Sequence, residues 1–445
     1  MGRSPREISQ TSALAFESEV RAALKSAEIS GDWGYPLAGA ATDSEEMTVA
    51  DWAYWLYKYA RPIERAEENV PEVLFLHNRS VVRLPDEFKA EAAVTMGAAG
   101  DLIPVDGMES SKDILFERVA DPLFDVDISF ANLEAPVTEQ AIEKSIIAGQ
   151  GPKNPAIMRN SPAQFSTLAG HREKNFTALN FANNHTFDMG IEGLETTQKL
   201  LTQNGIIPIG TPRNPEEYGR AVVITKEGIK IGFISATFGL NGHQLPVNEA
   251  HRIYTAKLTS KHVATDLGLL NMQIEDCKKQ RCDFIVASMH WGYEFEFFPR
   301  SRQVEAAHNL VEEGVDLILG HHPHVIQPLE YYRTKRDPNR IALIAYSLGG
   351  LTFWWDAAPH LVLGLILNMQ LVKGSIVGAS RTYLERIEPI PVFQDGFHQG
   401  DTRLLRIEKL EDHLSRCGDV GSDDRRKHIR QMKKYADLVL TNSII

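Results

Sequence analysis

The sequence predicts an α/β layered domain that is preceded by a helical extension and followed by a helical tail. Three observations support this prediction. From about residue 91, short β-rich apolar runs alternate with segments of helical period. The helical segments end at a glycine, as helices often do. Polar side chains gather directly after the apolar runs, which is where open α/β sheets form their sites.

Three segments are expected along the 445 residues. A helical extension covers residues 1–90, the α/β domain covers residues 91–395, and a polar, charged helical tail covers residues 396–445. In the extension, EVRAALKSAEI and TVADWAYWLYKYARPIERAEE carry apolar residues at a spacing near that of a helix turn. Thr48 is the expected N-cap of the second of these helices, and Pro62 is its expected terminator.

The strands predicted for the central domain follow one another with helices between several of them. In chain order the strands are AAVTMGAAGD, VDISFANLE, FTALNFANNH, KIGFISATF, DFIVASMHWG, VDLILGHHPH, IALIAYSLGG, HLVLGLILNMQLVKG and RTYLERIEPIPVF. The helices are GIEGLETTQKLLTQNG and RQVEAAHNLVEEG. This alternation is typical of a layered sheet covered by helices.

Composition excludes some functions. The net charge is −12, which argues against a nucleic-acid binder because such a protein presents a basic face to phosphates. The three cysteines, Cys277, Cys282 and Cys417, form no CxxC pair, as in a reduced, cytoplasmic protein without a thiolate metal site. No apolar stretch approaches the ~20 residues of a membrane helix. We therefore expect neither a membrane anchor nor an export signal, and the choice between monomer and homo-oligomer stays open.

Five polar clusters each follow a predicted strand. They contain Asp101; Asn132 and Glu134; Asn184 and His185; His290 and Glu294; and His321, His322 and His324. Each cluster alone fits a turn or a helix cap. Together they supply carboxylate, amide and imidazole groups, which are the ligands of a dinuclear centre. His322 and His324 would point the same way on a strand. We expect two divalent metal ions, and these ligands do not distinguish Mn, Fe, Zn and Ca.

The order of these clusters resembles the CapA-like proteins, the poly-γ-glutamate or capsule-synthesis branch of the calcineurin-like metallophosphoesterases. The blocks that carry the resemblance are GDLIP, NLEAPVT, NNHTFDMGIEGL, HWGYEFEFFP, GHHPHVIQPLE and YSLGGL, in that order between residues 92 and 395. The resemblance implies a four-layer α/β/β/α sandwich. It also implies that the metals lie between loops at one edge of the two sheets.

The resemblance further implies roles for single residues. Those that look like metal ligands, with Glu134 as the bridging carboxylate, are Asp101, Glu134, Asn184, His290, His322 and His324. His185 matches the histidine that protonates the leaving group in the phosphatases. Asp188 would orient an imidazole from behind, and a helix N-cap is an equal alternative for it. His321 stands where the phosphatases have glycine, so it is a weaker ligand candidate, grouped with Asp188 behind the ligands.

Two departures from the family pattern matter. Ile103 stands where the phosphatases have a histidine, so one metal site lacks an imidazole and phosphate-ester hydrolysis is less favoured. Capsule-synthesis CapA proteins typically carry an N-terminal membrane segment. This chain instead has a predicted helical extension, which disfavours polymer synthesis at a membrane.

Several functions stay open for such a centre. One is hydrolysis of a phosphoester or an amide, with His185 as the acid. Another is proton transfer at a peptide Cα, because a metal ion on a carboxylate or amide oxygen acidifies the neighbouring Cα proton. The CapA-like family includes a metal-dependent epimerase of lasso-peptide biosynthesis, and this chain looks similar to it in type. A CapA-like role in poly-γ-glutamate or capsule synthesis and a non-catalytic metal-binding module are further alternatives.

The aromatic content near the blocks favours epimerisation at a peptide. Trp291, Phe295, Trp354 and Trp355 are candidate substrate-binding residues, since an aromatic wall suits a peptide side chain better than a bare phosphate. Core packing is the alternative for them. The acid/base candidates are His185, Glu294 and Asp356. The expected partner is a peptide or another small carboxylate or phosphate substrate, with no nucleic acid and no membrane.

Overall fold

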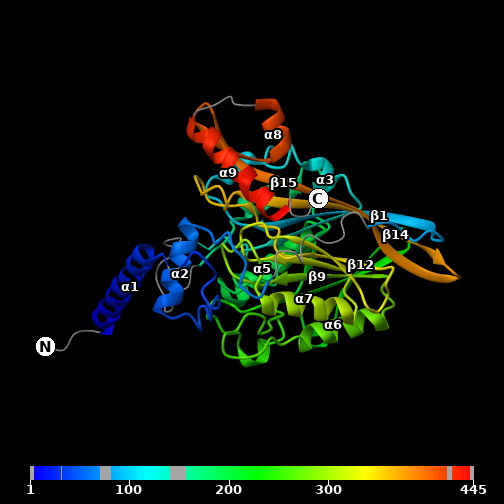
Figure 1. Cartoon of the computed structure of the whole chain (residues 1–445), viewed down its shortest axis with the longest axis horizontal. Coiled ribbons are helices and arrows are strands. Elements are labelled where there is room, and N and C mark those ends of the chain that lie inside the picture. Colours follow the sequence, from blue (N-terminus) through cyan, green and yellow to red (C-terminus); the bar gives the residue numbers. More distant parts are fainter. Residues whose placement is uncertain (1–4, 32, 71–81, 141–156, 418–422, 441–445) are drawn as a thin grey trace.

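The computed structural model describes residues 5–31, 33–70, 82–140, 157–417 and 423–440. Two β-sheets pack face to face at its centre, and helices cover their outer faces (Figure 1). This arrangement confirms the predicted four-layer α/β/β/α sandwich. Phe130 of the first sheet stacks on Phe233 of the second, with ring centroids 5.6 Å apart, so the space between the sheets is an apolar core.

The first sheet has the strand order β16-β15-β14-β1-β2-β5-β6, and β13 pairs with β1. Strands β1, β2, β5 and β6 are parallel, whereas β14, β15 and β16 continue the sheet in antiparallel fashion. The strands are β1 (Lys89–Leu102), β2 (Ile128–Leu133), β5 (Ala178–Asn180), β6 (Ile207–Ile209), β13 (Gly350–Thr352), β14 (Leu363–Ile376), β15 (Ala379–Gln399) and β16 (Thr402–Lys409).

The second sheet has the order β11-β12-β10-β9-β8-β7. Its four inner strands are parallel and its two edge strands are antiparallel to their neighbours. The strands are β7 (Val222–Lys226), β8 (Ile229–Thr237), β9 (Phe284–His290), β10 (Leu317–His321), β11 (Leu329–Arg333) and β12 (Ile341–Ala345). A small separate hairpin joins β3 (Gly170–His171) and β4 (Lys174–Asn175).

Helices lie on both outer faces. Those beside the first sheet are α3 (Ala120–Phe124), α4 (Pro162–Leu168) and α5 (Gly190–Gln203), with a 3₁₀ turn at Met108–Ser111. Those over the second sheet are α6 (Gly268–Lys279) and α7 (Ser301–Glu313), below β9 and β12 in Figure 1. Further 3₁₀ turns lie at Pro215–Glu217 and Val247–Glu249. The two helices predicted between strands are thus α5 and α7, and α7 ends at Gly314 as expected.

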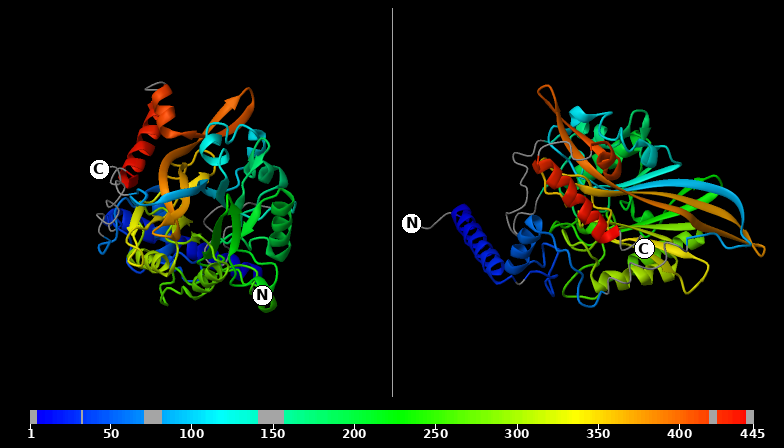
Figure 2. Two further views of the ribbon diagram at one scale, coloured as in Figure 1. Left: turned by 90° about the vertical axis from the view of Figure 1, so that its right-hand side faces the viewer. Right: turned by 45° about the horizontal axis from the view of Figure 1, so that its top comes forward.

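The N-terminal helices are α1 (Pro5–Ser30) and α2 (Val49–Ala60). Helix α1 leads away from the body of the molecule, and its helical neighbour is α2 (Figure 2). Thr48 caps α2 as predicted, because its hydroxyl accepts from the backbone of Asp51 while the Asp51 carboxylate accepts from the backbone of Thr48. The helix ends at Ala60, directly before Arg61 and Pro62.

The expectation of a helical tail from residue 396 was wrong for its first part. Strand β15 runs to Gln399 and β16 follows, pairing with β15 over eight residues, so helix starts only at α8 (Leu410–Cys417) and continues in α9 (Asp423–Leu440). Leu405 and Ile407 of β16 are fully buried, while Arg406 pairs with Glu117 at 3.0 Å. Hairpin pairing with β15, across the two residues between Gln399 and Thr402, therefore overrides the charged composition of this segment.

Among the described residues, no helix combines the length and the apolar character that crossing a membrane requires.

Candidate metal centre

The candidate residues meet because parallel strands of both sheets end at the same edge. Asp101 of β1 lies beside Asn132 of β2 in register, and His321 of β10 lies beside His290 of β9. Glu134 directly follows β2. The carboxyl ends of parallel strands collect their loops at one edge of a sheet, and here the two edges face each other.

A close backbone approach holds Asp101 in place. A side chain on Gly100 would bring its Cβ to 1.9 Å from the carbonyl oxygen of Gly349, so only glycine fits there. That same carbonyl accepts the backbone N–H of Asp101 at 3.0 Å. The YSLGGL block therefore contributes backbone contacts to the centre rather than ligand side chains.

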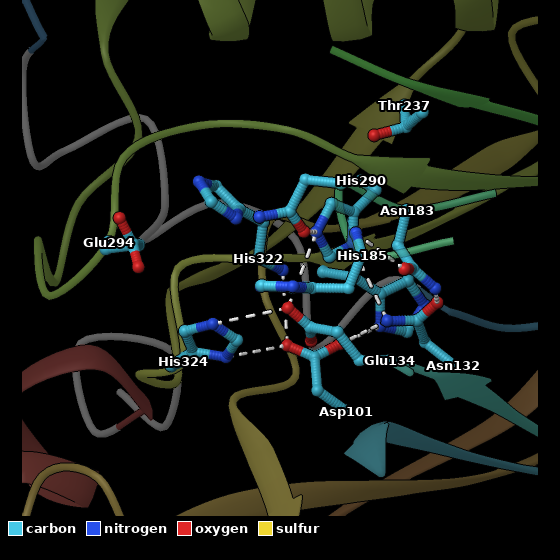
Figure 3. Close-up of polar contacts among 12 residues, drawn as sticks. Asp101, Asn132, Glu134, Asn183, His185, Thr237, His290, Glu294, His322 and His324 are labelled. Carbon is cyan, nitrogen blue, oxygen red and sulfur yellow. Dashed lines mark hydrogen bonds and ion pairs between the residues drawn. The ribbon is translucent and has the colours of Figure 1, made fainter. Parts of the chain in front are cut away.

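Within the part of the chain that the structure describes, two groups of side chains have the geometry to hold a metal ion. One consists of Glu134, His290 and His322, and the other of Asp101, Glu134 and His324. Within each group the donor atoms lie within 4.8 Å of one another. Glu134 belongs to both, with its Oε1 atom 3.7 Å from His290 Nε2 and 3.4 Å from His324 Nε2 (Figure 3).

Asn184 adds an amide oxygen to the first group, since its Oδ1 atom lies 2.7 Å from His290 Nε2. The structure thus brings together all six residues that the sequence suggested as ligands. The second group has three members, of which His324 is the one imidazole. Ile103, directly after β1, adds no ligand and is buried in the apolar core.

The residues present fit a pair of divalent cations. Both carboxylate oxygens of Glu134 are buried without a hydrogen-bond partner among the described residues, and so is Nδ1 of His322. Burying a carboxylate without a partner is costly, and buried charges in proteins are normally paired or bound to metal. A mixed set of carboxylate, amide and imidazole donors suits Mn, Fe or Zn.

The pKa values of the two carboxylates of the centre, Asp101 and Glu134, are shifted in opposite directions. Burial alone would raise the pKa of Asp101, but hydrogen bonds with His321 and His324 outweigh it and hold that pKa well below the usual value. Burial, with the charge of Asp101 added, raises the pKa of Glu134 well above its usual value. Burial also lowers the pKa of His290 well below normal, which keeps that imidazole neutral and able to bind metal.

The expectation that His322 and His324 alternate on a strand was wrong. Strand β10 ends at His321, and the next residues form a bend in which His322 has φ 92° and His324 has φ 55°. A left-handed backbone is uncommon for residues other than glycine, and such strain concentrates at functional sites. The bend, rather than the strand period, brings both imidazoles to the centre.

Asp188 was predicted to orient an imidazole, and the imidazole that it contacts is that of His185. Nδ1 of His185 lies 2.7 Å from Oδ2 of Asp188, which also accepts the backbone N–H of Met158 at 2.7 Å. Asp188 therefore fixes the ring of His185. The alternative that Asp188 caps α5 was wrong, because the N-cap is Met189 and no side chain caps the helix. His321 lies outside both groups, with Nδ1 3.1 Å from Oδ1 of Asp101.

The comparison with known families covers this whole centre. Residues 95–353 match the family model described as bacterial capsule synthesis protein PGA_cap. The chain belongs to the PGA_cap family. It is 26% identical to the capsule biosynthesis protein CapA of Bacillus anthracis over 60% of this chain and 62% of that protein. It is 28% identical to the PGA biosynthesis protein CapA of Bacillus subtilis over 55% of this chain and 58% of that protein. The chain thus spans about three fifths of the length of these relatives.

In this PGA_cap member, two residues of the predicted aromatic wall lie near the centre: Phe295, which is buried in the core, and Trp354, which is partly exposed. The Phe295 ring is 6.3 Å from the His324 ring and 5.6 Å from Trp55 of α2. Trp354 packs on Phe353, which is itself 5.7 Å from the His324 ring. Glu294 is partly exposed and stands apart from the ligands in Figure 3, and burial raises its pKa.

Three predicted residues are not brought to the centre. Trp291 is 1% exposed and its indole N–H donates to the carbonyl of Tyr346, so it is a core residue. The indole N–H of Trp355 donates to the carbonyl of Asp106, and Arg403 lies over its ring. The Asp356 side chain is 83% exposed and pairs with Arg403 at 2.7 Å. Asp356 has a positive φ of 55°, so it is better described as a turn residue than as an acid or base.

Three contacts of the centre were not predicted from the sequence. Asn241 donates toward Nε2 of His185 at 3.4 Å, and it follows β8 as the other clusters follow their strands, so the same rule could have found it. Thr42 contacts His322, and Trp55 donates to Glu294. These two lie in the N-terminal extension, where no strand end marks them.

Proposed function

We propose that this chain binds two divalent cations through Glu134 and acts with them on poly-γ-glutamate or a closely related glutamate amide. The observation that carries the metal centre is the position of Glu134, which both ligand groups share and whose two oxygens are buried without a hydrogen-bond partner among the described residues. The substrate class follows from the relatives in the two Bacillus species, whose names refer to capsule and PGA biosynthesis.

The charge distribution supports cations as the anchor for an acidic substrate. Lys58 and Arg300 are the buried cationic side chains near the Phe295 wall, and both are paired with Glu296 at 2.9 Å. They are therefore not free to bind a polyanion. Bound divalent cations would act as Lewis acids on a carboxylate or amide oxygen of the substrate.

The remaining residues of the centre supply proton transfer and orientation. His185 is held through Nδ1 by Asp188, so its Nε2 atom, which otherwise meets the Asn241 amide at 3.4 Å, is the one placed to give or take a proton. Phe295 and Phe353 flank His324 and exclude water from that side. The lowered pKa of His322, caused by burial, keeps its second nitrogen available as a donor to metal.

Proton exchange at a peptide Cα, which the sequence favoured, is the second candidate. One observation supports it. Glu294 is a partly exposed carboxyl beside the Phe295 wall, and burial moves its pKa upward, toward the range of a base that works near neutral pH. Glu294 and His185 would then form the acid/base pair. Epimerisation ranks second because the names of the relatives refer to capsule and PGA biosynthesis.

The test uses the full chain reconstituted with Mn²⁺ in deuterated water. Three probes are compared by mass spectrometry: a γ-linked glutamate oligomer, its α-linked isomer and an aryl phosphate. We expect a metal-dependent change in length or linkage of the γ-linked oligomer only. Deuterium uptake at Cα without a change in length would favour epimerisation. Phosphate release with both oligomers unchanged would overturn the proposal.

The matched variants are His322→Ala/His324→Ala and His398→Ala. The first pair removes one imidazole from each ligand group. His398 is exposed on β15, outside both groups. We expect the double variant to lose the reaction and the His398 variant to keep it.

A further inference from the structure

The N-terminal strap, residues 33–63, runs along one side of the metal centre. Polar contacts from the loops after β8 and β9 fix its path. Arg300 donates to the carbonyl of Leu37 at 2.8 Å, and the Tyr293 hydroxyl donates to that of Ala40 at 3.2 Å. Lys261 pairs with Asp51 at 2.8 Å. Because both flanks are held, the residues between Ala40 and Asp51 have a defined position against the domain.

Within the strap, Thr42 touches the centre directly. Its Oγ1 atom lies 2.9 Å from Nε2 of His322, and its side chain is buried. On another side, the Phe238 ring packs against the His322 ring with centroids 4.5 Å apart. The His290 ring is also close, with its centroid 5.0 Å from that of His322, so these contacts together hold a ring whose backbone has an unusual conformation.

The two nitrogens of His322 have different surroundings. Nε2 faces the Thr42 hydroxyl, whereas Nδ1 is buried and has no hydrogen-bond partner among the described residues. A neutral imidazole carries its proton on one nitrogen and a lone pair on the other. If Nε2 holds the proton, the hydroxyl accepts it and Nδ1 presents the lone pair.

We propose that Thr42 is a positioning residue of the metal centre. Its hydroxyl accepts the Nε2 proton of His322 and thereby fixes the tautomer and ring orientation in which Nδ1 binds the cation of the Glu134, His290 and His322 group. Metal-binding histidines normally donate their other N–H to such a partner. The inference rests on the proposed two-cation centre. Residue 42 lies outside the range 95–353 that matches the family model, so family membership does not assign this role.

Removal of the Thr42 hydroxyl should weaken metal binding at one site and leave the other site unchanged. The contact from Thr42 reaches His322, which belongs to one ligand group, and not His324 or Asp101, which belong to the other. Loss of an outer partner of a metal-binding histidine weakens metal binding by about 10- to 100-fold. That loss should therefore appear in one of two binding steps.

The experiment titrates the metal-free, full-length chain with Co²⁺, and visible absorption and calorimetry report each binding step. Thr42→Val removes the hydroxyl at nearly constant volume, and Thr42→Ser restores it. Thr259→Val is the matched control, because Thr259 is also buried but its hydroxyl has no partner among the described residues. Thr42→Ala is a second variant without the hydroxyl, should valine disturb folding.

We expect Thr42→Val and Thr42→Ala to weaken one binding step by about 10- to 100-fold. Thr42→Ser and Thr259→Val should bind like the wild type, and the melting temperature of the metal-free chain should stay unchanged in all four. Two unchanged steps in Thr42→Val would overturn the proposal. So would equal weakening of both steps with a lower melting temperature, since that would be a general structural defect. A wild-type chain that binds no Co²⁺ would instead overturn the two-cation centre.

Discussion

Glu134 and Asp101 are neighbouring buried carboxylates with opposite surroundings. Asp101 accepts from Nδ2 of Asn132 at 2.8 Å and from the backbone N–H of His322 at 3.2 Å. Glu134 accepts no hydrogen bond from the described residues. Their pKa values move in opposite directions. Burial raises that of Glu134, whereas contacts with His321 and His324 outweigh burial and lower that of Asp101. Glu134 is therefore the carboxylate that most needs a metal ion as its partner.

This difference predicts how many metal sites each substitution affects. Glu134→Gln should weaken both Mn²⁺ sites, because both ligand groups share Glu134, whereas Asp101→Asn should weaken one. Each loss of metal affinity should exceed the about 10- to 100-fold weakening that follows removal of a hydrogen-bond partner of a metal-binding histidine. Calorimetric titration of the metal-free chain measures it. Asp188→Asn is the control, since Asp188 contacts His185 and belongs to neither group.

A Glu134→Gln chain that keeps one site at full strength would contradict a shared carboxylate.

Single site residues could be predicted from the sequence where they lie at the end of a predicted strand. The six ligand candidates each lie at the carboxyl end of a strand or in the loop after it, so their assembly could be foreseen from the parallel topology. Trp291 also follows a strand, yet it turns into the core, because the pattern does not tell on which side of the chain an aromatic ring packs. Thr42 could not be foreseen, since its contact joins residues 280 positions apart.

At the scale of elements, Glu296 fastens α2 to the loop after β9. Its carboxylate accepts from Lys58 of α2 and from Arg300, each at 2.9 Å, and from the Tyr54 hydroxyl at 3.1 Å. Burial raises its pKa, but Arg300 and then Lys58 outweigh burial and bring the pKa to about 2. Lys58, Arg300 and Glu296 thus form one buried ion network between the N-terminal extension and the α/β domain.

This network predicts a pH-dependent contribution to stability. The pKa of Glu296 falls from 4.5 to about 2 on folding, which corresponds to about 3 kcal/mol. Because the folded pKa is depressed, that stability is present above the unfolded value and is lost as pH falls from 4.5 toward 2. Glu296→Gln should therefore be less stable than wild type at neutral pH by about 3 kcal/mol, and the gap should close in acid.

Denaturant unfolding of both chains across this pH range measures the gap. Glu275→Gln is the control, since Glu275 pairs with Lys278 on the surface of α6 and should change stability little. A gap that stays constant with pH would show that the carboxylate charge is not its origin.

The elements themselves were largely predictable. Helix α2 carries its cap and terminator in sequence, and α7 carries its terminal glycine. Strand β16 was missed because its arginines and lysine resemble a solvated helix. In the structure they lie over acidic side chains, as Lys409 does on Asp121 at 2.7 Å. Hairpin pairing with β15 decides the conformation of β16, and Gly400 in the turn, with φ 60°, is the signal in the sequence that was overlooked.

At the scale of the whole molecule, the centre joins the two sheets. Asp101 and Glu134 come from the first sheet, and His290, His322 and His324 come from the second (Figure 3). Each ligand group contains members from both. Two cations bound there would tie the sheets together at the edge where their parallel strands end. The strap closes the centre from a third direction, through Thr42 and Trp55.

The most direct test of this account is anomalous diffraction from crystals of the full-length chain grown with Mn²⁺. Two anomalous peaks are expected, one on each side of the Glu134 carboxylate and about 3.5–4 Å apart. One peak should lie among His290, His322 and Asn184, and the other between Asp101 and His324. No peak at the centre, or a single peak without contact to Glu134, would contradict the two-cation centre on which the proposed function rests.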